Sequence, residues 1–304
     1  MVTLRVVAPT LHVVASIMID RVLGLAALPQ PGQTVVARSL RTFPGGKGAN
    51  QAVAAARCGA QVRACGRTGA DGRFVVDAMQ AAGVDVSAVR TDDAVAGSAV
   101  VLVAEGGENA IVIAPESNRR IGPGDIERFL DGAAPGDLLL VQNECSALEH
   151  ALAAARARGL HAWLNAAPAD PALRGLDLSG LAGLFVNETE AQALTGLADP
   201  AAALDALSMR MPDATVVVTL GPAGARMRHR GAMHVHAGYR VRAVDTVGCG
   251  DAFVGAFLAA TLAGRPSAEA LAWGNAAGAL AATREGAIPS LPALDAVRAL
   301  ALPA

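Results

Sequence analysis

Short apolar segments alternate with helix-like segments along most of the 304-residue chain, and this alternation limits the possible folds more than any other feature. It requires an open, mostly parallel sheet with helices on both faces. We therefore predict a doubly wound α/β fold in which residues 1–304 form one domain. The strands are predicted at 11–17, 61–67, 138–141, 160–164, 184–186 and 215–219, and helices at 71–82, 126–130 and 146–158.

Two stretches interrupt the alternation. Residues 21–44 contain several prolines and glycines around the β-branched segment Thr34–Val36. Residues 96–114 have a hairpin pattern centred on Glu105–Asn109. We predict that both stretches lie outside the main sheet. Residues 1–10 precede the first predicted strand and are given no role.

Composition and charge argue against several classes of function. The net charge of −2 comes with no basic cluster that would suit a nucleic acid. No apolar run approaches the roughly 18 residues of a membrane span, and the N-terminus lacks a leader with a cleavage site, so we expect a cytoplasmic protein that binds no membrane. The four cysteines form no metal-binding or redox motif and are expected to be reduced thiols.

A glycine-rich turn, residues 245–250, runs directly into the apolar segment 251–257. Its glycines allow several N–H groups to point into one concavity at the positive end of a helix, and such concavities bind anions. Asp251 on the first turn is well placed to accept a proton from a hydroxyl that attacks a phosphoryl group. The alternative is that Asp251 only caps the helix and the glycines only turn the chain.

A second glycine run, Gly45–Gly48, contains a lysine and opens another helix of small residues, with Asn50 one turn later. In this order, and about two hundred residues apart, the two segments resemble the paired signatures of the ribokinase (PfkB) family of sugar kinases. The resemblance extends over nearly the whole chain. Further segments that resemble the family are 16–20, 142–144, 164–169, 187–190, 219–221 and 275–290.

The resemblance implies a ribokinase-like fold with a small β-sheet lid over the sugar. The lid would be formed by the two interrupting stretches, about 21–44 and 96–114. An outlying sheet that exposes an apolar face needs a partner surface, so we predict a homodimer through the lid.

The resemblance also implies which residues bind the sugar. They are Asp20, Gly46, Lys47, Asn50 and Glu144. Taken singly, Asp20 could start a turn, Lys47 could be a surface lysine, and Glu144 could be a charge at a helix N-terminus. Ribokinases carry an asparagine where this chain has Met18, and a thioether is a poor partner for a sugar hydroxyl. The identity of the sugar therefore stays open.

Nucleotide and metal residues are implied in the same way. ATP would be bound by Asn187, Thr219, Gly221 and Asn275. Glu190 would position Mg²⁺ through water, although Asn187 and Glu190 also fit a capping box, a role compatible with metal positioning. Potassium is implied beside the anion-binding turn. Its ligands would come from Asp245, Val247, Ala282, Glu285 and Ser290.

These residues together predict an ATP-dependent kinase of a small sugar, with the conversion of ribose to ribose 5-phosphate as the default. Asp251 would be the general base, and the N–H groups of Gly248, Cys249 and Gly250 would form an anion hole for the γ-phosphate. A kinase of another sugar or of a nucleoside is the close alternative, and few aromatic residues argue mildly against a nucleoside. A non-catalytic regulator that binds sugar or nucleotide is less favoured, because Asp251 and the glycines are intact.

Cys249 departs from the small residues, such as alanine, that are usual at this position in the family. The positive potential of a helix N-terminus favours the thiolate, so we predict a thiol that reacts with alkylating reagents. Burial and the nearby Asp251 would act in the opposite direction.

Overall fold

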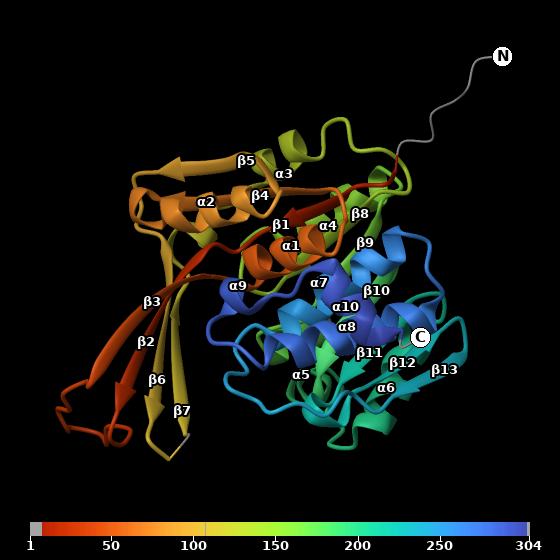
Figure 1. The fold of residues 1–304 in the computed structure, drawn as a ribbon. Helices are drawn as coiled ribbons and strands as arrows, with labels where there is room; N and C mark the ends of the chain where they lie inside the picture. The colour runs from red at the N-terminus through yellow and green to blue at the C-terminus, as the bar shows by residue number, and fades with distance from the viewer. Residues whose placement is uncertain (1–7, 107, 303–304) are drawn as a thin grey trace.

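The structure is a computed structural model that describes residues 8–106 and 108–302, so residues 1–7 of the predicted extension lie outside it. Its centre is a sheet of nine strands in the order β13-β12-β11-β10-β9-β8-β1-β4-β5 (Figure 1). The parallel strands are β1 (Leu11–Val14), β4 (Val62–Gly69), β5 (Asp85–Asp92), β8 (Leu138–Gln142), β9 (His161–Asn165), β10 (Leu181–Asn187) and β11 (Thr215–Thr219). β12 (Ala225–His229) and β13 (Ala232–His236) add an antiparallel edge.

Helices cover both faces of this sheet, and two hydrophobic cores result. Successive side chains of a strand point to opposite faces, so Leu140 enters one core while its neighbour Leu139 enters the other. The first core packs against α1 (Lys47–Arg57), α2 (Arg73–Ala81), α7 (Cys249–Leu262), α8 (Ser267–Ala281) and α10 (Leu294–Ala301). The second packs against α3 (Pro123–Phe129), α4 (Leu148–Ala157), α5 (Glu188–Thr195) and α6 (Pro200–Arg210). The predicted doubly wound α/β fold is confirmed.

A four-stranded sheet in the order β3-β2-β6-β7 projects away from the main sheet (Figure 1). We call it the lid sheet. It consists of β2 (Met18–Leu25), β3 (Ser39–Gly45), β6 (Gly97–Ala104) and β7 (Asn109–Ala114). Short helical turns complete the chain: η1 (Ala70–Gly72), η2 (Glu116–Arg120), η3 (Pro171–Gly175), η4 (Gly221–Ala223) and α9 (Ala287–Ser290).

The boundary between the two sheets differs from the prediction. The strand expected at 11–17 ends at Val14, and Asp20, expected just beyond that strand, lies within β2 of the lid sheet. The β-branched segment Thr34–Val36 belongs to no strand, because β3 begins only at Ser39 after a turn that contains Gly32. The first sugar-binding candidate therefore sits on the lid sheet and not at the end of the central strand.

The strand order reverses at β1, which has β4 on one side and β8 on the other. Open α/β sheets bind ligands outside the carboxyl ends of the strands at such a switch point. Here the switch point places the segment after β1 beside the segment after β8, which carries Glu144. No helix in the described part of the chain is both long and apolar enough to cross a bilayer.

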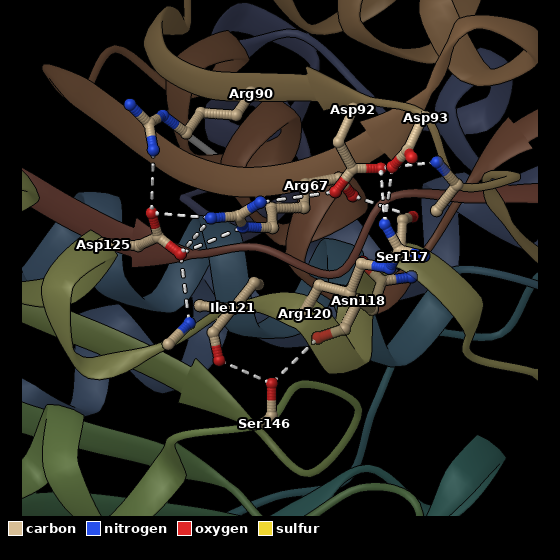
Figure 2. A network of polar contacts seen from close by, with 12 residues as sticks. Arg67, Arg90, Asp92, Asp93, Ser117, Asn118, Arg120, Ile121, Asp125 and Ser146 are labelled. Carbon is tan, nitrogen blue, oxygen red and sulfur yellow. Dashed lines mark hydrogen bonds and ion pairs between the residues drawn. The ribbon is translucent and has the colours of Figure 1, made fainter.

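Polar contacts around Asn118 fix the lid sheet to the main body, and Figure 2 shows the one between Asn118 and Ser146. The buried Asn118 side chain accepts a hydrogen bond from the Ile17 N–H (2.9 Å) and donates to the carbonyls of Ile17 and Pro115 (both 3.0 Å). Ser146 in turn donates from its N–H and its Oγ to the Asn118 carbonyl (both 3.3 Å). Asn118 thus connects the start of β2 and the end of β7 to the loop that carries Glu144.

Candidate active site

The glycine run before α1 lets the start of this helix lie directly against the segment that follows β1. Gly46 has a φ of +96°, and a Cβ there would lie 2.5 Å from the Ser16 carbonyl oxygen. This approach allows the Ala49 N–H to reach the Ser16 carbonyl and the Gly48 N–H to reach Ser16 Oγ, both at 3.0 Å. The first turn of α1, with Lys47 and Asn50, is held at the switch point as a result.

Glu144 lies inside this crevice. Its Oε2 accepts hydrogen bonds from Ser16 Oγ (2.6 Å) and from the Lys47 N–H (3.0 Å). Burial raises the pKa of Glu144 above its usual range, and the charge of Lys47 opposes that rise. Glu144 is therefore tied to α1 and to the segment after β1, and its carboxylate does not serve as a simple charge at a helix N-terminus.

Asp20 and Lys47 face each other among several charges. Burial is the main cause that raises the pKa of Asp20 to about 7, with Glu144 and Asp251 adding to it. Burial lowers the pKa of Lys47, but carboxylates led by Asp251 outweigh this effect and leave the pKa raised. Lys47 also lines the cavity described below, so it is not a lysine that simply extends into solvent.

Asp251 is held by side chains of a different helix. Its Oδ2 accepts from Asn50 Nδ2 and its Oδ1 accepts from Gln51 Nε2, both at 2.8 Å. No side chain caps α7 at its N-terminus, where Gly248 is the capping residue, so the interpretation of Asp251 as a helix cap is wrong. Burial raises the pKa of Asp251, while Lys47 and the two amides lower it.

The turn before α7 is the segment predicted to form an anion site. Gly248 adopts a φ of +78°, which only glycine tolerates easily, and a Cβ there would lie 3.0 Å from the Ala287 Cα. Gly248, Gly250 and Asp251 line one cavity. The Cys249 N–H donates to the Thr246 carbonyl at 3.3 Å, so one of the three N–H groups assigned to the anion hole already has a partner.

The surroundings of Cys249 act against the predicted thiolate. Burial, followed by the charges of Asp245 and Asp251, raises the pKa of Cys249 to about 11. These effects disfavour the thiolate, whereas the positive end of α7 favours it.

The cavity in front of α7 has a volume of about 240 Å³. Of the predicted nucleotide and magnesium residues, Asn187, Glu190 and Thr219 line it, and Gly221 begins the next turn, η4. Asn187 and Glu190 form the expected capping box, each accepting from the other's backbone N–H at 2.8 Å. Asn275 is not among the lining residues, since it is buried on α8 and its amide donates to the Leu271 carbonyl at 2.8 Å.

The predicted potassium segments meet beside the glycine turn that precedes α7. Asp245 accepts from the N–H groups of Val247 (3.0 Å) and Gly286 (2.9 Å). The Ala282 carbonyl already accepts two hydrogen bonds, from the N–H groups of Val244 and Asp245. Two of the proposed residues are otherwise engaged: Ser290 Oγ donates to the Ala287 carbonyl, and Glu285 forms an ion pair with Arg41 of the lid sheet. Among the residues that the structure describes, no three His, Cys, Asp or Glu side chains gather to hold a metal ion.

Two site residues were not given a role from the sequence. Gln51 binds Asp251, and Gln142 Nε2 donates to Gln51 Oε1 at 2.9 Å. Both lie in segments that resemble the ribokinase family, and Gln51 directly follows Asn50. Neither has the charge or the nucleophile that usually marks a catalytic side chain, so only the contact itself identifies them.

Several known proteins resemble this chain in sequence and in structure. The sequence model of the pfkB family of carbohydrate kinases matches residues 8–294. Ribokinase from Haemophilus influenzae is 36% identical over 296 residues, which cover 93% of this chain and 95% of that protein. Deoxyribokinase from Salmonella typhi is 33% identical over 258 residues, covering 81% and 83%. The solved structure of Arabidopsis thaliana ribokinase complexed with ribose and ATP has a TM-score of 0.83 at 28% identity and covers 97% of this chain and 99% of that chain.

Proposed function

Because the chain belongs to the pfkB family of carbohydrate kinases and is a sugar kinase, we propose that it transfers the γ-phosphoryl group of ATP to a hydroxyl of a pentose, with ribose to ribose 5-phosphate as the default. One observation carries the proposal. Lys47 and Asp251 line one cavity of about 240 Å³, and both lie close enough to Asp20 and Glu144 to affect the pKa values of these two carboxylates. Membership in a kinase family also sets aside the non-catalytic regulator.

The sugar is held by Asp20, Glu144 and Asn50 in this proposal. The two carboxylates accept hydrogens from sugar hydroxyls. Asn50 Oδ1 is buried and finds no hydrogen-bond partner among the described residues, so it fits a hydroxyl donor from the substrate. Because Asn50 Nδ2 already donates to Asp251, a sugar hydroxyl at Oδ1 lies near the carboxylate that accepts its proton.

The phosphates of ATP lie toward the N-terminus of α7, with the γ-phosphate against the N–H groups of the turn Gly248–Gly250. Unpaired N–H groups and the helix dipole at such a terminus favour an anion, and Lys47 adds a positive charge. Asn187, Thr219 and Gly221 contact the nucleotide, and Asn275 stays a prediction for its adenine end. Asp251 takes the proton of the attacking hydroxyl.

The proposal includes sites for two metal ions, Mg²⁺ and K⁺. Each Glu190 carboxylate oxygen accepts one hydrogen bond from Asn187 and retains lone pairs toward the cavity, so Glu190 fits a role in holding Mg²⁺ through water. Mg²⁺ bound there would neutralise charge on the phosphates. Potassium would bind beside Asp245 and the carbonyl of Val247. The loop that carries both residues is fixed by hydrogen bonds from the N–H groups of Val247 and Gly286 to the Asp245 carboxylate.

A pentose that lacks one hydroxyl is a second candidate substrate. Met18 replaces the asparagine of ribokinases, and it lies two residues before Asp20 on β2. Alternate residues of a strand point to the same face, so Met18 and Asp20 share a face and an apolar side chain borders the proposed sugar site. The deoxyribokinase among the relatives is consistent with 2-deoxyribose as a substrate.

The assembly and location follow from other surfaces. We propose a homodimer through the lid sheet, because Ile111, Val112 and Ile113 of β7 are exposed. The four cysteines are free thiols, as expected for a protein in the reducing cytoplasm, which is where we place it.

A coupled ATPase assay over pentoses, hexoses and nucleosides, run with wild type and Asp251→Asn, tests the proposal. Removal of a general base costs about 10² to 10⁴ in rate, so we expect kcat to fall by that factor while sugar and ATP dissociation constants stay within a few-fold. Asp213→Asn, at an exposed carboxylate outside the cavity, is the matched control and should keep the wild-type rate. A near wild-type kcat in Asp251→Asn would refute the role of Asp251.

A further inference from the structure

A chain of buried side-chain hydrogen bonds runs from the central sheet to Asp251. Gln142, the last residue of β8, donates from Nε2 to Gln51 Oε1 at 2.9 Å. Gln51 on α1 donates from its own Nε2 to Asp251 Oδ1 at 2.8 Å. The exposed fractions of these three residues are 1%, 0% and 7%, so water does not compete for the contacts.

The chemistry of the three groups fixes the direction of this chain. An ionised carboxylate only accepts hydrogen bonds, so Gln51 must turn its NH₂ group toward Asp251 and its oxygen away. The oxygen then needs a donor on the far side, and Gln142 Nε2 is that donor. Without it, the Gln51 amide could rotate by half a turn and present its oxygen to the carboxylate.

We propose that Gln142 is a positioning residue for the kinase reaction: by donating to Gln51 Oε1, it keeps the N–H donor of Gln51 on the Asp251 carboxylate. Gln142 contacts no reacting atom and acts only through Gln51. The inference rests on the proposed role of Asp251 as the general base.

Several charged groups lie near Asp251, so its pKa depends also on the neutral groups that donate hydrogen bonds to it. Lys47 at the start of α1 favours the charged carboxylate. Negative charges face the same region from other elements: Asp20 on β2, Glu144 after β8 and Glu190 on α5. Burial raises the pKa of Cys249, two residues earlier on α7. Burial raises the pKa of Asp251, and the amides of Asn50 and Gln51 lower it, so loss of a donor raises the pKa further.

A substitution of Gln142 can remove its hydrogen bond to Gln51 alone. Its Oε1 has no hydrogen-bond partner in the described part of the chain, and it lies close to Gly48, where a Cβ would be 2.8 Å away. Replacement by methionine, which is unbranched and similar in length, removes the bond to Gln51 and no other hydrogen bond of that side chain. Glutamate keeps the shape but can only accept, so it pulls the Gln51 NH₂ group away from Asp251.

The test is the pH dependence of kcat at saturating sugar and ATP, measured for wild type, Gln142→Met, Gln51→Met and the double variant. A general base must be unprotonated, so kcat falls as pH falls through its pKa, and a raised pKa moves this acid limb to higher pH. We expect a shift of about one pH unit in each single variant, with the plateau rate within a few-fold of wild type. The double variant should shift no further than Gln51→Met, because Gln142 acts through Gln51.

Two results would overturn the proposal. The first is a uniform loss of rate at every pH with an unmoved acid limb, which is what a packing defect produces. The second is a double variant whose shift is the sum of the two single shifts. Saturating sugar keeps the titration of Asp20 out of the profile, since that group acts on sugar binding.

Gln142→Glu provides a second test in case Gln142→Met does not fold. It should shift the acid limb at least as far as the methionine variant, and an unmoved limb in this variant also refutes the proposal. Asp251→Asn distinguishes a failure of the general-base assignment from a failure of the positioning role. If that variant keeps its rate, the base assignment fails. If it is inactive while the Gln142 variants leave the limb in place, only the positioning role fails.

Discussion

We expect the choice of sugar to depend on a single side chain of the lid sheet, Met18. Met18 is 2% exposed, and its strand neighbours are Gly45 and Gly97, which have no side chains to displace it from the face it shares with Asp20. If Met18 borders the sugar as we propose, its apolar thioether leaves a sugar hydroxyl without a partner and disfavours ribose relative to a sugar that lacks that hydroxyl.

We therefore predict that Met18→Asn raises the ratio of kcat/KM for ribose to that for 2-deoxyribose by about tenfold, the effect of one net hydrogen bond. Ile19→Val is the matched control, because the Ile19 side chain is on the opposite face of β2. Initial rates with both sugars measure the ratio. An unchanged ratio in Met18→Asn would show that this residue does not face the sugar.

Sequence reasoning could name candidate site residues but not the environment of their side chains. The glycine-rich segments led to Lys47, Asn50 and Asp251, because a glycine run that opens a helix is visible locally. Gln51 and Gln142 are 91 positions apart, and no local pattern reveals that one orients the other. The pKa of Cys249 also escaped prediction, since it depends on how burial and two carboxylates compare with a helix terminus, and only the folded chain sets that comparison.

At the scale of elements, the lid sheet and the Glu144 loop are coupled by one buried amide. Asn118 is part of no catalytic motif, yet its side chain binds Ile17 and Pro115, which adjoin the lid strands β2 and β7. Its carbonyl accepts a hydrogen bond from Ser146 (Figure 2). In the proposed site, Asp20 on the lid sheet and Glu144 on the loop bind the same sugar, so their spacing should matter for binding.

We predict that Asn118→Asp raises KM for the sugar by about tenfold and lowers Tm, with a smaller effect on kcat. An aspartate cannot donate to the carbonyls of Ile17 and Pro115, and a buried acceptor facing other acceptors costs about 1–3 kcal/mol. Asn109→Asp, an exposed asparagine on β7, is the control. Steady-state kinetics and thermal unfolding give the result, and an unchanged KM despite a lowered Tm would limit Asn118 to a role in stability.

Elements were predictable where the hydrophobic pattern is simple. The buried strands β8 and β11 were placed within a residue of their observed limits, because continuous apolar runs mark strands covered on both faces. The break between β1 and β2 was missed, since apolar residues continue from Leu11 to Ile19 while the chain passes from one sheet to the other. β5, an edge strand with many polar residues, has no such run and was not predicted.

At the scale of the whole molecule, the lid sheet has more apolar surface than one chain covers. Asp20 pairs with Ala99 across β2 and β6, and Ala99 pairs with Ile113 across β6 and β7. Paired residues lie on the same face, so Ile111 and Ile113 extend the face that carries Asp20, and Val112 lies on the other face. A partner subunit that covers Ile111 and Ile113 would also border the sugar site.

We predict a dimer whose interface is the face of the lid sheet that carries Asp20. Ile111 is 56% exposed and Val112 64% exposed, so both are accessible in a single chain and a lysine at either position is tolerated by the fold. Burying a lysine side chain without a partner is costly, so Ile111→Lys should yield monomers in sedimentation velocity, and Val112→Lys, on the same strand but the opposite face, should remain dimeric. KM for the sugar should rise in Ile111→Lys alone, because the interface continues from the sugar site. A monomeric wild type would contradict the prediction, and dissociation by Val112→Lys with a dimeric Ile111→Lys would place the interface on the other face.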